Sequence, residues 1–200
     1  MSISTDDRDY AAAKTAQNFF RDAVDYCLKG SLAELTKLIQ DYLITNSKVN
    51  SQDLLLDFKS EGKTLLHVAA SGGHAAIVDY LISLLKSAKG KNALLNASDD
   101  RGFTPLINAT ISESDTIIAI FLKNGADVNA LNKDGAGAVH FAAGDGSVSR
   151  LKLLTDAGAN IKAMSETGEI CCKNLCNGHN YNSKDLRSNS NSKSSQVGLI

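Results

Sequence analysis

The sequence lacks the features that mark several large classes of protein. It contains no run of about 18 apolar residues, so no segment is expected to cross a bilayer as a helix. Its first residues, Met1 to Asp9, are polar and acidic and lack the basic-then-apolar order of a signal peptide. The formal net charge is only -1, which argues against the basic surface typical of proteins that bind nucleic acid or anionic membrane. We therefore expect a soluble, cytoplasmic protein with no nucleic-acid or membrane partner.

Motifs for catalysis and cofactor binding are also scarce. No glycine-rich loop that would cradle a phosphate is present, and Gly144-Asp145-Gly146 is better explained as a turn between helices. Cys27 stands alone in a predicted helix, whereas the other three cysteines crowd together late in the chain, unlike the dispersed framework of a small secreted domain. We therefore expect reduced thiols, no cofactor and no enzymatic activity.

The late cysteines leave one alternative open. Thiolate and imidazole are ligands that zinc prefers, and the sequence places Cys171, Cys172, Cys176 and His179 close together. The paired Cys-x-x-Cys hooks of structural zinc sites are missing, and adjacent cysteines rarely bind one ion comfortably. A metal- or thiol-dependent regulator that uses these four residues remains an alternative to a segment that merely packs small apolar side chains.

The most informative feature that is present is an internal repeat. Gly102, Gly135 and Gly168 lie 33 residues apart, and each opens a similar stretch of sequence. An earlier copy begins at Gly62 and reads GKTLLHVAA, followed by GHAAIV from Gly73. This period and these motifs resemble the ankyrin repeat family. The resemblance implies an all-α ankyrin repeat solenoid, in which helix-turn-helix units are joined by β-hairpin-like loops.

The repeat pattern divides the chain into a short stack with atypical ends, because a terminal unit must turn a polar side to water. Residues 18–57 form a degenerate N-terminal capping repeat and its linker, after a polar segment at 1–17. The domain of three full repeats, 58–164, consists of units 58–98, 99–131 and 132–164. A partial C-terminal capping repeat follows at 165–179. Residues 180–200 are rich in Ser and Asn and are expected to be a disordered tail.

The first full unit carries the most complete motif and also an insertion. Thr64 is expected to begin a helix with its hydroxyl accepting a backbone amide, while His67 bridges to neighbouring backbone. The interval from Gly62 to Gly102 is 40 residues rather than 33, and the surplus fits best between Ile82 and Ala93. We expect a helical extension with a solvated loop there, or else a lysine-bearing protrusion for an acidic partner.

The next two units depart from the family pattern at single positions. Ile107 replaces the family histidine that His140 retains, and Gly137 replaces the threonine before His140, so that helix start loses a cap. Glu113-Ser114 replaces the Gly-His between helices, which predicts a different turn. Arg150 stands where the family has Ile or Val, so it is expected to extend from the core edge or pair with an acid.

The resemblance implies a non-catalytic protein-interaction module, an adaptor, scaffold or inhibitor, that binds as a monomer through a concave surface of hairpins and first helices. The apolar side chains among the expected contacts are candidate anchors, unless neighbouring hairpins cover them, and the charged ones select the partner. An effector of a bacterium or virus acting in a host cell is a further alternative, and the protein partner is unidentified. The expected protein-binding residues are Ser60, Glu61, Lys63, Ser71, Asp100, Arg101, Phe103, Ile111, Ser112, Leu131, Lys133, Asp134, Asp145 and Met164.

Overall fold

The computed structural model describes residues 5–46, 49, 51–57, 60–85 and 88–161. Within these residues the chain forms ten α-helices and no strand beyond isolated bridges. No helix in this part of the chain is long and apolar enough to cross a membrane. The helices are α1 (Thr5–Lys29), α2 (Leu32–Thr45), α3 (Ser51–Asp57), α4 (Leu65–Ser71), α5 (Ala75–Ser83), α6 (Ala88–Leu95), α7 (Pro105–Ile111), α8 (Asp115–Lys123), α9 (Ala138–Gly144) and α10 (Val148–Asp156).

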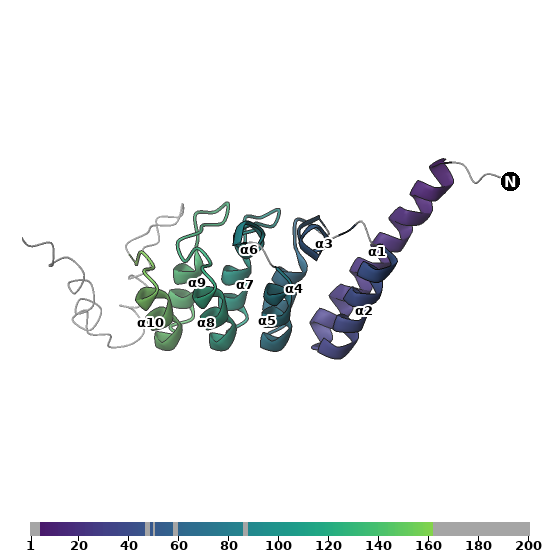
Figure 1. The fold of residues 1–200 in the computed structure, drawn as a ribbon. Helices are drawn as coiled ribbons and strands as arrows, with labels where there is room; N and C mark the ends of the chain where they lie inside the picture. The colour runs from purple at the N-terminus through teal and green to yellow at the C-terminus, as the bar shows by residue number, and fades with distance from the viewer. Residues whose placement is uncertain (1–4, 47–48, 50, 58–59, 86–87, 162–200) are drawn as a thin grey trace, which may run out of the picture.

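Eight of these helices are arranged as antiparallel pairs that stack in chain order (Figure 1). We call α1, α4, α7 and α9 the first helices, and α2, α5, α8 and α10 the second helices. Each first helix packs against the first helix of the next pair, and α5, α8 and α10 pack in the same order. One continuous core of buried aliphatic and aromatic side chains runs through the stack. The predicted all-α ankyrin solenoid is confirmed.

The N-terminal pair is longer than the sequence indicated. Phe19, Ala23 and Cys27 of α1 are buried against Leu35 and Ile39 of α2, as the apolar spacing predicts. However, α1 begins at Thr5, so the segment expected to precede the capping repeat belongs largely to its first helix. The stretch at 5–17 contains no Gly or Pro and includes three consecutive alanines, the best helix formers, which favours this continuation.

The insertion in the first full unit forms an additional helix. The helix α5 ends at Ser83, so the prediction that it extends is wrong. A separate helix, α6, follows, and its Gly90, Leu94 and Leu95 are buried. It packs against α3, which also lies outside the regular pairs. The predicted position of the surplus, between Ile82 and Ala93, fits this arrangement, while the side chains of Lys86 and Lys89 lie outside the described residues.

The turn between the two helices of a pair is the same in every unit. Gly30, Gly73 and Gly146 adopt φ values of 75°, 75° and 68°, and Glu113 adopts 57° at the equivalent position. The Glu113 N–H donates to the Thr110 carbonyl at 3.2 Å, as the Gly73 N–H donates to Ala70. The prediction of a different turn is therefore wrong. A residue with a side chain takes the left-handed conformation instead, at a cost of about 1–2 kcal/mol.

Candidate functional site

The hairpin before α4 is a tight two-residue turn. Ser60 and Lys63 exchange both backbone hydrogen bonds, at 3.1 and 2.9 Å. The two central residues, Glu61 and Gly62, have φ values of 53° and 70°. Positive φ at both central positions is the geometry of a type I′ turn, whose twist matches that of the flanking chain. Glu61 is thereby held at an exposed tip.

The two following hairpins are closed by side chains at equivalent positions. The Asp99 carboxylate accepts from the backbone N–H groups of Arg101 at 2.9 Å and Phe103 at 2.8 Å. In the next unit the Asn132 side-chain oxygen accepts from two backbone N–H groups with the same spacing, at 3.0 and 2.8 Å. The side-chain oxygens of Asp99 and Asn132 are therefore occupied by hydrogen bonds within their own hairpins and are not available to a partner.

Neighbouring hairpins are joined to one another by backbone hydrogen bonds. The Asp100 N–H donates to the Glu61 carbonyl at 3.2 Å, and the Lys133 N–H donates to the Arg101 carbonyl at 3.1 Å. A Cβ at Gly62 or Gly102 would approach the next hairpin's backbone nitrogen to 2.5 or 2.7 Å, so glycine is required at both close approaches. The hairpins therefore form one continuous row beside the first helices.

The first full repeat is tied to this row by a buried histidine. His67 Nδ1 accepts from the Thr64 N–H at 3.1 Å, so Nε2 carries the ring proton and donates to the Phe103 carbonyl at 3.0 Å. The Thr64 hydroxyl lies 2.9 Å from the same Nδ1. Thr64 is the N-cap of α4, as expected, and in the next unit the Thr104 hydroxyl accepts from the Ile107 N–H at 3.3 Å. The bridging role of His67 is confirmed.

The C-terminal ends of the first helices receive polar side chains from the next unit. The last carbonyls of a helix have no partner within it. His74 Nε2 donates to the Leu28 carbonyl at 3.0 Å, and the Ser112 hydroxyl donates to the Ala70 carbonyl at 2.8 Å. Arg150 donates to the Thr110 carbonyl at 3.1 Å. Each unit boundary thus closes with a different donor to one of the last carbonyls of the preceding first helix.

We call the surface formed by the hairpins and the exposed residues of the first helices the hairpin–helix face. Most of the residues expected to bind a partner are exposed on it, while Lys63 and Ser112 are half-buried and Met164 lies outside the described residues. The exposed ones are Ser60, Glu61, Ser71, Asp100, Arg101, Ile111, Leu131, Lys133, Asp134 and Asp145.

Phe103 is the exception among the expected anchors. Its side chain is only 9% exposed, and its ring packs against Phe141 with centroids 5.7 Å apart. The Arg101 guanidinium lies over the Phe103 ring, 5.0 Å from its centroid. The expectation that Phe103 is an exposed anchor is therefore wrong, because the neighbouring repeat covers it. Ile111 and Leu131 remain as large apolar side chains, 46% and 50% exposed.

On the first helices, the sequence did not predict one exposed large apolar residue. Leu28, in the last turn of α1, is 55% exposed. Leu28 lies off the apolar stripe of Phe19, Ala23 and Cys27 that faces the core. This offset is the feature of the sequence from which its exposure could have been predicted. With respect to the common turn, Leu28 occupies the same position as Ser71, Ile111 and Gly144 in the other first helices.

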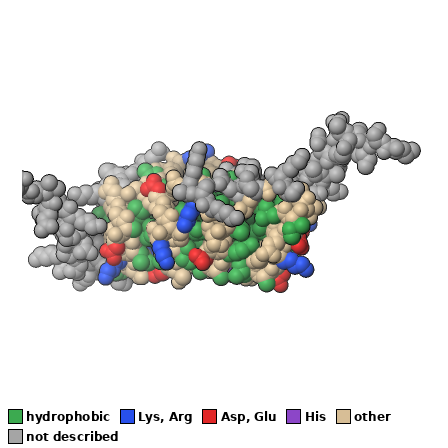
Figure 2. Space-filling view, in the orientation of Figure 1, with side chains coloured by type: hydrophobic (Ala, Val, Ile, Leu, Met, Phe, Trp, Pro, Cys, Tyr) green, Lys and Arg blue, Asp and Glu red, His purple; other side chains and the backbone are tan. Residues whose placement is uncertain are grey.

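A groove opens beside Leu28, between α1, α4 and the first hairpin. Its volume is about 320 Å³. Its lining comprises Phe20, Val24, Leu28, Ser60, Glu61, Lys63, His67, Val68 and Ser71. Figure 2 shows hydrophobic side chains gathered near the α1–α2 end of one face of the stack, with charges of both signs scattered along the rest.

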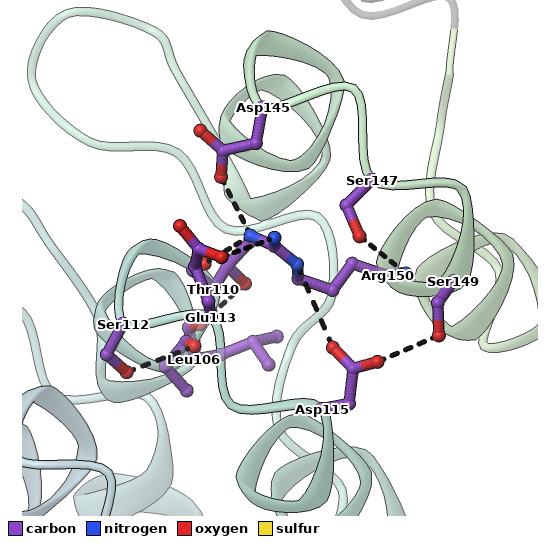
Figure 3. Close-up of polar contacts among 10 residues, drawn as sticks. Leu106, Thr110, Ser112, Glu113, Asp115, Asp145, Ser147, Ser149 and Arg150 are labelled. Carbon is purple, nitrogen blue, oxygen red and sulfur yellow. Dashed lines mark hydrogen bonds and ion pairs between the residues drawn. The ribbon is translucent and has the colours of Figure 1, made fainter.

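Arg150 is the most buried charged residue among those that the structure describes. Figure 3 shows its surroundings. Its side chain is 8% exposed and reaches Asp145 at 2.7 Å, Glu113 at 3.2 Å and Asp115 at 3.8 Å. The Ser149 hydroxyl donates to the second oxygen of Asp115 at 2.8 Å. The expected pairing of Arg150 with an acid is confirmed. One guanidinium faces three carboxylates, so this edge keeps two excess negative charges.

Residues for metal or thiol chemistry are sparse in the part of the chain that the structure describes. No group of three or more His, Cys, Asp or Glu there could hold a metal ion. Cys27 is a free, buried thiol, and burial raises its pKa to about 12, so it is not a nucleophile near neutral pH. The group Cys171, Cys172, Cys176 and His179 lies outside the described residues.

Comparisons with known proteins agree with this architecture. A family model described as ankyrin repeats in three copies matches residues 20–132 and 83–165. A putative ankyrin repeat protein, L371, of Acanthamoeba polyphaga mimivirus is 27% identical over 120 residues, which are 60% of this chain and 16% of that protein. The B-cell lymphoma 3 protein homolog of Mus musculus is 34% identical over 101 residues, or 50% of this chain and 21% of the relative.

A third relative shows the same partial coverage. The nuclear factor NF-kappa-B p105 subunit of Gallus gallus is 31% identical over 93 residues, 46% of this chain and 9% of its own length. The chain thus matches about a fifth of the mouse relative and smaller fractions of the other two.

Proposed function

The chain belongs to the ankyrin repeat family, and from this premise we propose that it is a non-catalytic adaptor, scaffold or inhibitor that binds another protein. Ankyrin repeats are protein-interaction modules, and the hairpin–helix face is the surface through which this one binds. We further propose that it acts in the cytoplasm as a monomer. The protein partner is not identified by the fold, because function resides in the surface and not in the architecture.

The observation that carries the proposal is the exposure of Ile111 and Leu131. Both are large aliphatic side chains on a face whose other exposed residues, apart from Leu28, are mostly polar or charged. Phe103, which precedes both in the sequence, is buried, whereas these two side chains face water. Apolar side chains surrounded by polar groups supply affinity at interfaces, whereas charges at the rim such as Asp100 and Lys133 select the partner.

Site-specific photo-crosslinking tests this proposal. A benzoylphenylalanine placed at Leu131 or Ile111 is expected to form crosslinks to one recurring partner in cells. The matched control is Ile44 of α2, which is 77% exposed but lies on a second helix. Equal crosslinking from Ile44, or crosslinks from none of the three positions, contradicts binding through the hairpin–helix face.

A further inference from the structure

We propose that the groove between α1, α4 and the first hairpin takes a large aliphatic side chain of the partner protein, and that a basic side chain of the same segment pairs with Glu113. This inference rests on the proposed function, because it names the chemistry of the partner at the hairpin–helix face. It adds a site at the α1–α4 boundary to the two exposed apolar residues described above.

The groove has the size and chemistry of a side-chain pocket. Its volume of about 320 Å³ lies at the lower end of the range of about 300–1,000 Å³ found for ligand sites. Phe20, Val24 and Val68 are half-buried and supply apolar lining, and Leu28 is 55% exposed beside them. Such a surface gains most from covering by another apolar group, at about 25 cal/mol for each Å² removed from water.

Three local features keep the groove open. Ser71 is small where the neighbouring first helices carry Leu28 and Ile111, and its hydroxyl makes no hydrogen bond among the described residues. Lys63 holds the hairpin position that Phe103 holds in the next unit, so a flexible charged side chain stands there instead of a packed ring. The described part of the chain also has no hairpin before α1, because α1 continues to Thr5.

The charges around the groove favour a basic neighbour for the inserted side chain. At the hairpin, Glu61 and Lys63 lie 3.6 Å apart and balance one another. On the other side, the Ser112 hydroxyl binds the Ala70 carbonyl, which brings the turn of Glu113 next to the end of α4. Glu113 is 68% exposed and shares one guanidinium with two other carboxylates. The excess charge closest to the groove is therefore negative and lies one unit away, at the turn of Glu113.

The spacing of the helices sets the length of the partner segment. Packed helices lie about 8–10 Å apart. The groove lies between α1 and α4, and the turn of Glu113 follows α7, so their centres are about one and a half helix spacings apart, or roughly 12–15 Å. About four residues of extended chain cover this distance. The partner segment thus carries Leu, Ile, Met or Phe about four residues from Lys or Arg, and Ile111, 46% exposed, lies along its path.

Peptide selection on the full chain tests the proposal. A phage-displayed library of random peptides is selected on the purified protein, and the most enriched peptide is synthesised and its binding measured by fluorescence anisotropy. We expect enriched sequences with the aliphatic-to-basic spacing given above. Acidic sequences, sequences without a large apolar residue, or no enrichment contradict the proposal.

Variants of the groove decide where the peptide binds. Leu28→Glu and Ser71→Tyr, which change exposed positions, are expected to weaken binding at least about tenfold, because they charge or fill the groove. Ile44→Glu is the matched control and leaves binding unchanged. Glu113→Gln is expected to weaken binding about threefold and to reduce its salt dependence. Unfolding midpoints of all four variants verify that they are folded.

The same experiment separates the groove from the proposed function and from other occupants. A peptide that ignores the groove variants but is lost in Leu131→Glu overturns the groove and leaves the hairpin–helix face as the binding surface. If the molecular mass in solution doubles as the protein concentration rises, and Leu28→Glu returns it to the mass of a monomer, the groove is assigned to a second copy of this chain. Competition by a synthetic peptide of residues 180–200 assigns it to this chain's own C-terminal segment. The last two outcomes contradict the proposal.

Discussion

The carboxylate of Glu113 lies 3.2 Å from the guanidinium of Arg150, although the two residues belong to different repeats. Glu113 stands where the other turns have glycine, and Arg150 stands where the resemblance leads us to expect Ile or Val. Each departure is costly alone, since one places a side chain in the left-handed region and the other buries a charge. Together they form an ion pair, while Arg150 also satisfies the Thr110 carbonyl. The two exceptions to the repeat pattern therefore support one another at one unit boundary.

Replacing Arg150 by Met is expected to destabilise the protein by about 1–3 kcal/mol, because the hydrogen bonds made by its buried charged group are lost. The Thr110 carbonyl keeps the Glu113 N–H but loses its charged donor, and the three carboxylates lose the positive charge between them. Because these carboxylates are partly exposed, their mutual repulsion adds little. Urea unfolding followed by circular dichroism measures the change. Lys152→Met, on an exposed position of the same helix, is the control, and an equal effect there contradicts the assignment.

The backbone conformation of Glu113 gives a prediction with a defined sign. Glu113→Gly and Glu113→Ala both remove the carboxylate, but only alanine keeps a Cβ in the left-handed region. We expect the glycine variant to be more stable than the alanine variant by about 1 kcal/mol. The comparison is reversed at Glu34, an exposed position within α2, where alanine is expected to be better by about 1 kcal/mol. The same order at both positions in urea unfolding contradicts the strained turn.

The repeat period was sufficient to predict the helix pairs and their stacking order. The period identifies the positions that have the same structural role in every unit, such as the buried alanines and the turn residue with a left-handed conformation. The turn at Glu113 shows the limit of this reasoning. The stack around it determines the backbone path, so the turn survives the loss of the glycine that normally permits it.

The candidate site was less predictable than the fold, and Phe103 shows why. Whether a hairpin side chain is exposed depends on the residue at one position of the next first helix, here Phe141, and no single repeat contains that information. The helix α6 was missed for a related reason. Its buried Leu94 and Leu95 pack outside the regular pairs, partly through α3, so the repeat pattern does not describe them.

His67 is expected to be required for the boundary between the first two full units. Replacing it by Ile, the residue found at the equivalent position 107, removes the donor to the Phe103 carbonyl. The Thr64 N–H also loses its acceptor, Nδ1 of the ring, although the Thr64 hydroxyl can accept the N–H of residue 67 as Thr104 does for Ile107. We expect a loss of about 1–3 kcal/mol in the free energy of unfolding.

Amide hydrogen exchange localises the effect of this change. Faster exchange in His67→Ile is expected for the hairpin at 99–103 and for α4, and not for α10. Ile107→Val is the control, since it removes a methylene from the next unit without breaking a polar link. An even loss of protection throughout the stack, or none at all, contradicts a specific bridge from His67 to Phe103.

The buried thiol of Cys27 predicts a loss of stability at alkaline pH. Burial raises the pKa of this thiol to about 12 from an ordinary value of 9.0, so the folded state holds the proton more tightly than the unfolded state. The resulting stability is fully present below pH 9, falls as the pH rises above 9, and is lost by about 12. At pH 11 the loss is expected to be about 3 kcal/mol. Tyrosines titrate in the same range, so the measurement is the difference in unfolding free energy between the native sequence and Cys27→Ala. If the thiol is responsible, this difference shrinks or changes sign between pH 8 and pH 11, because alanine has no proton to lose. A difference that stays constant over this range contradicts the prediction.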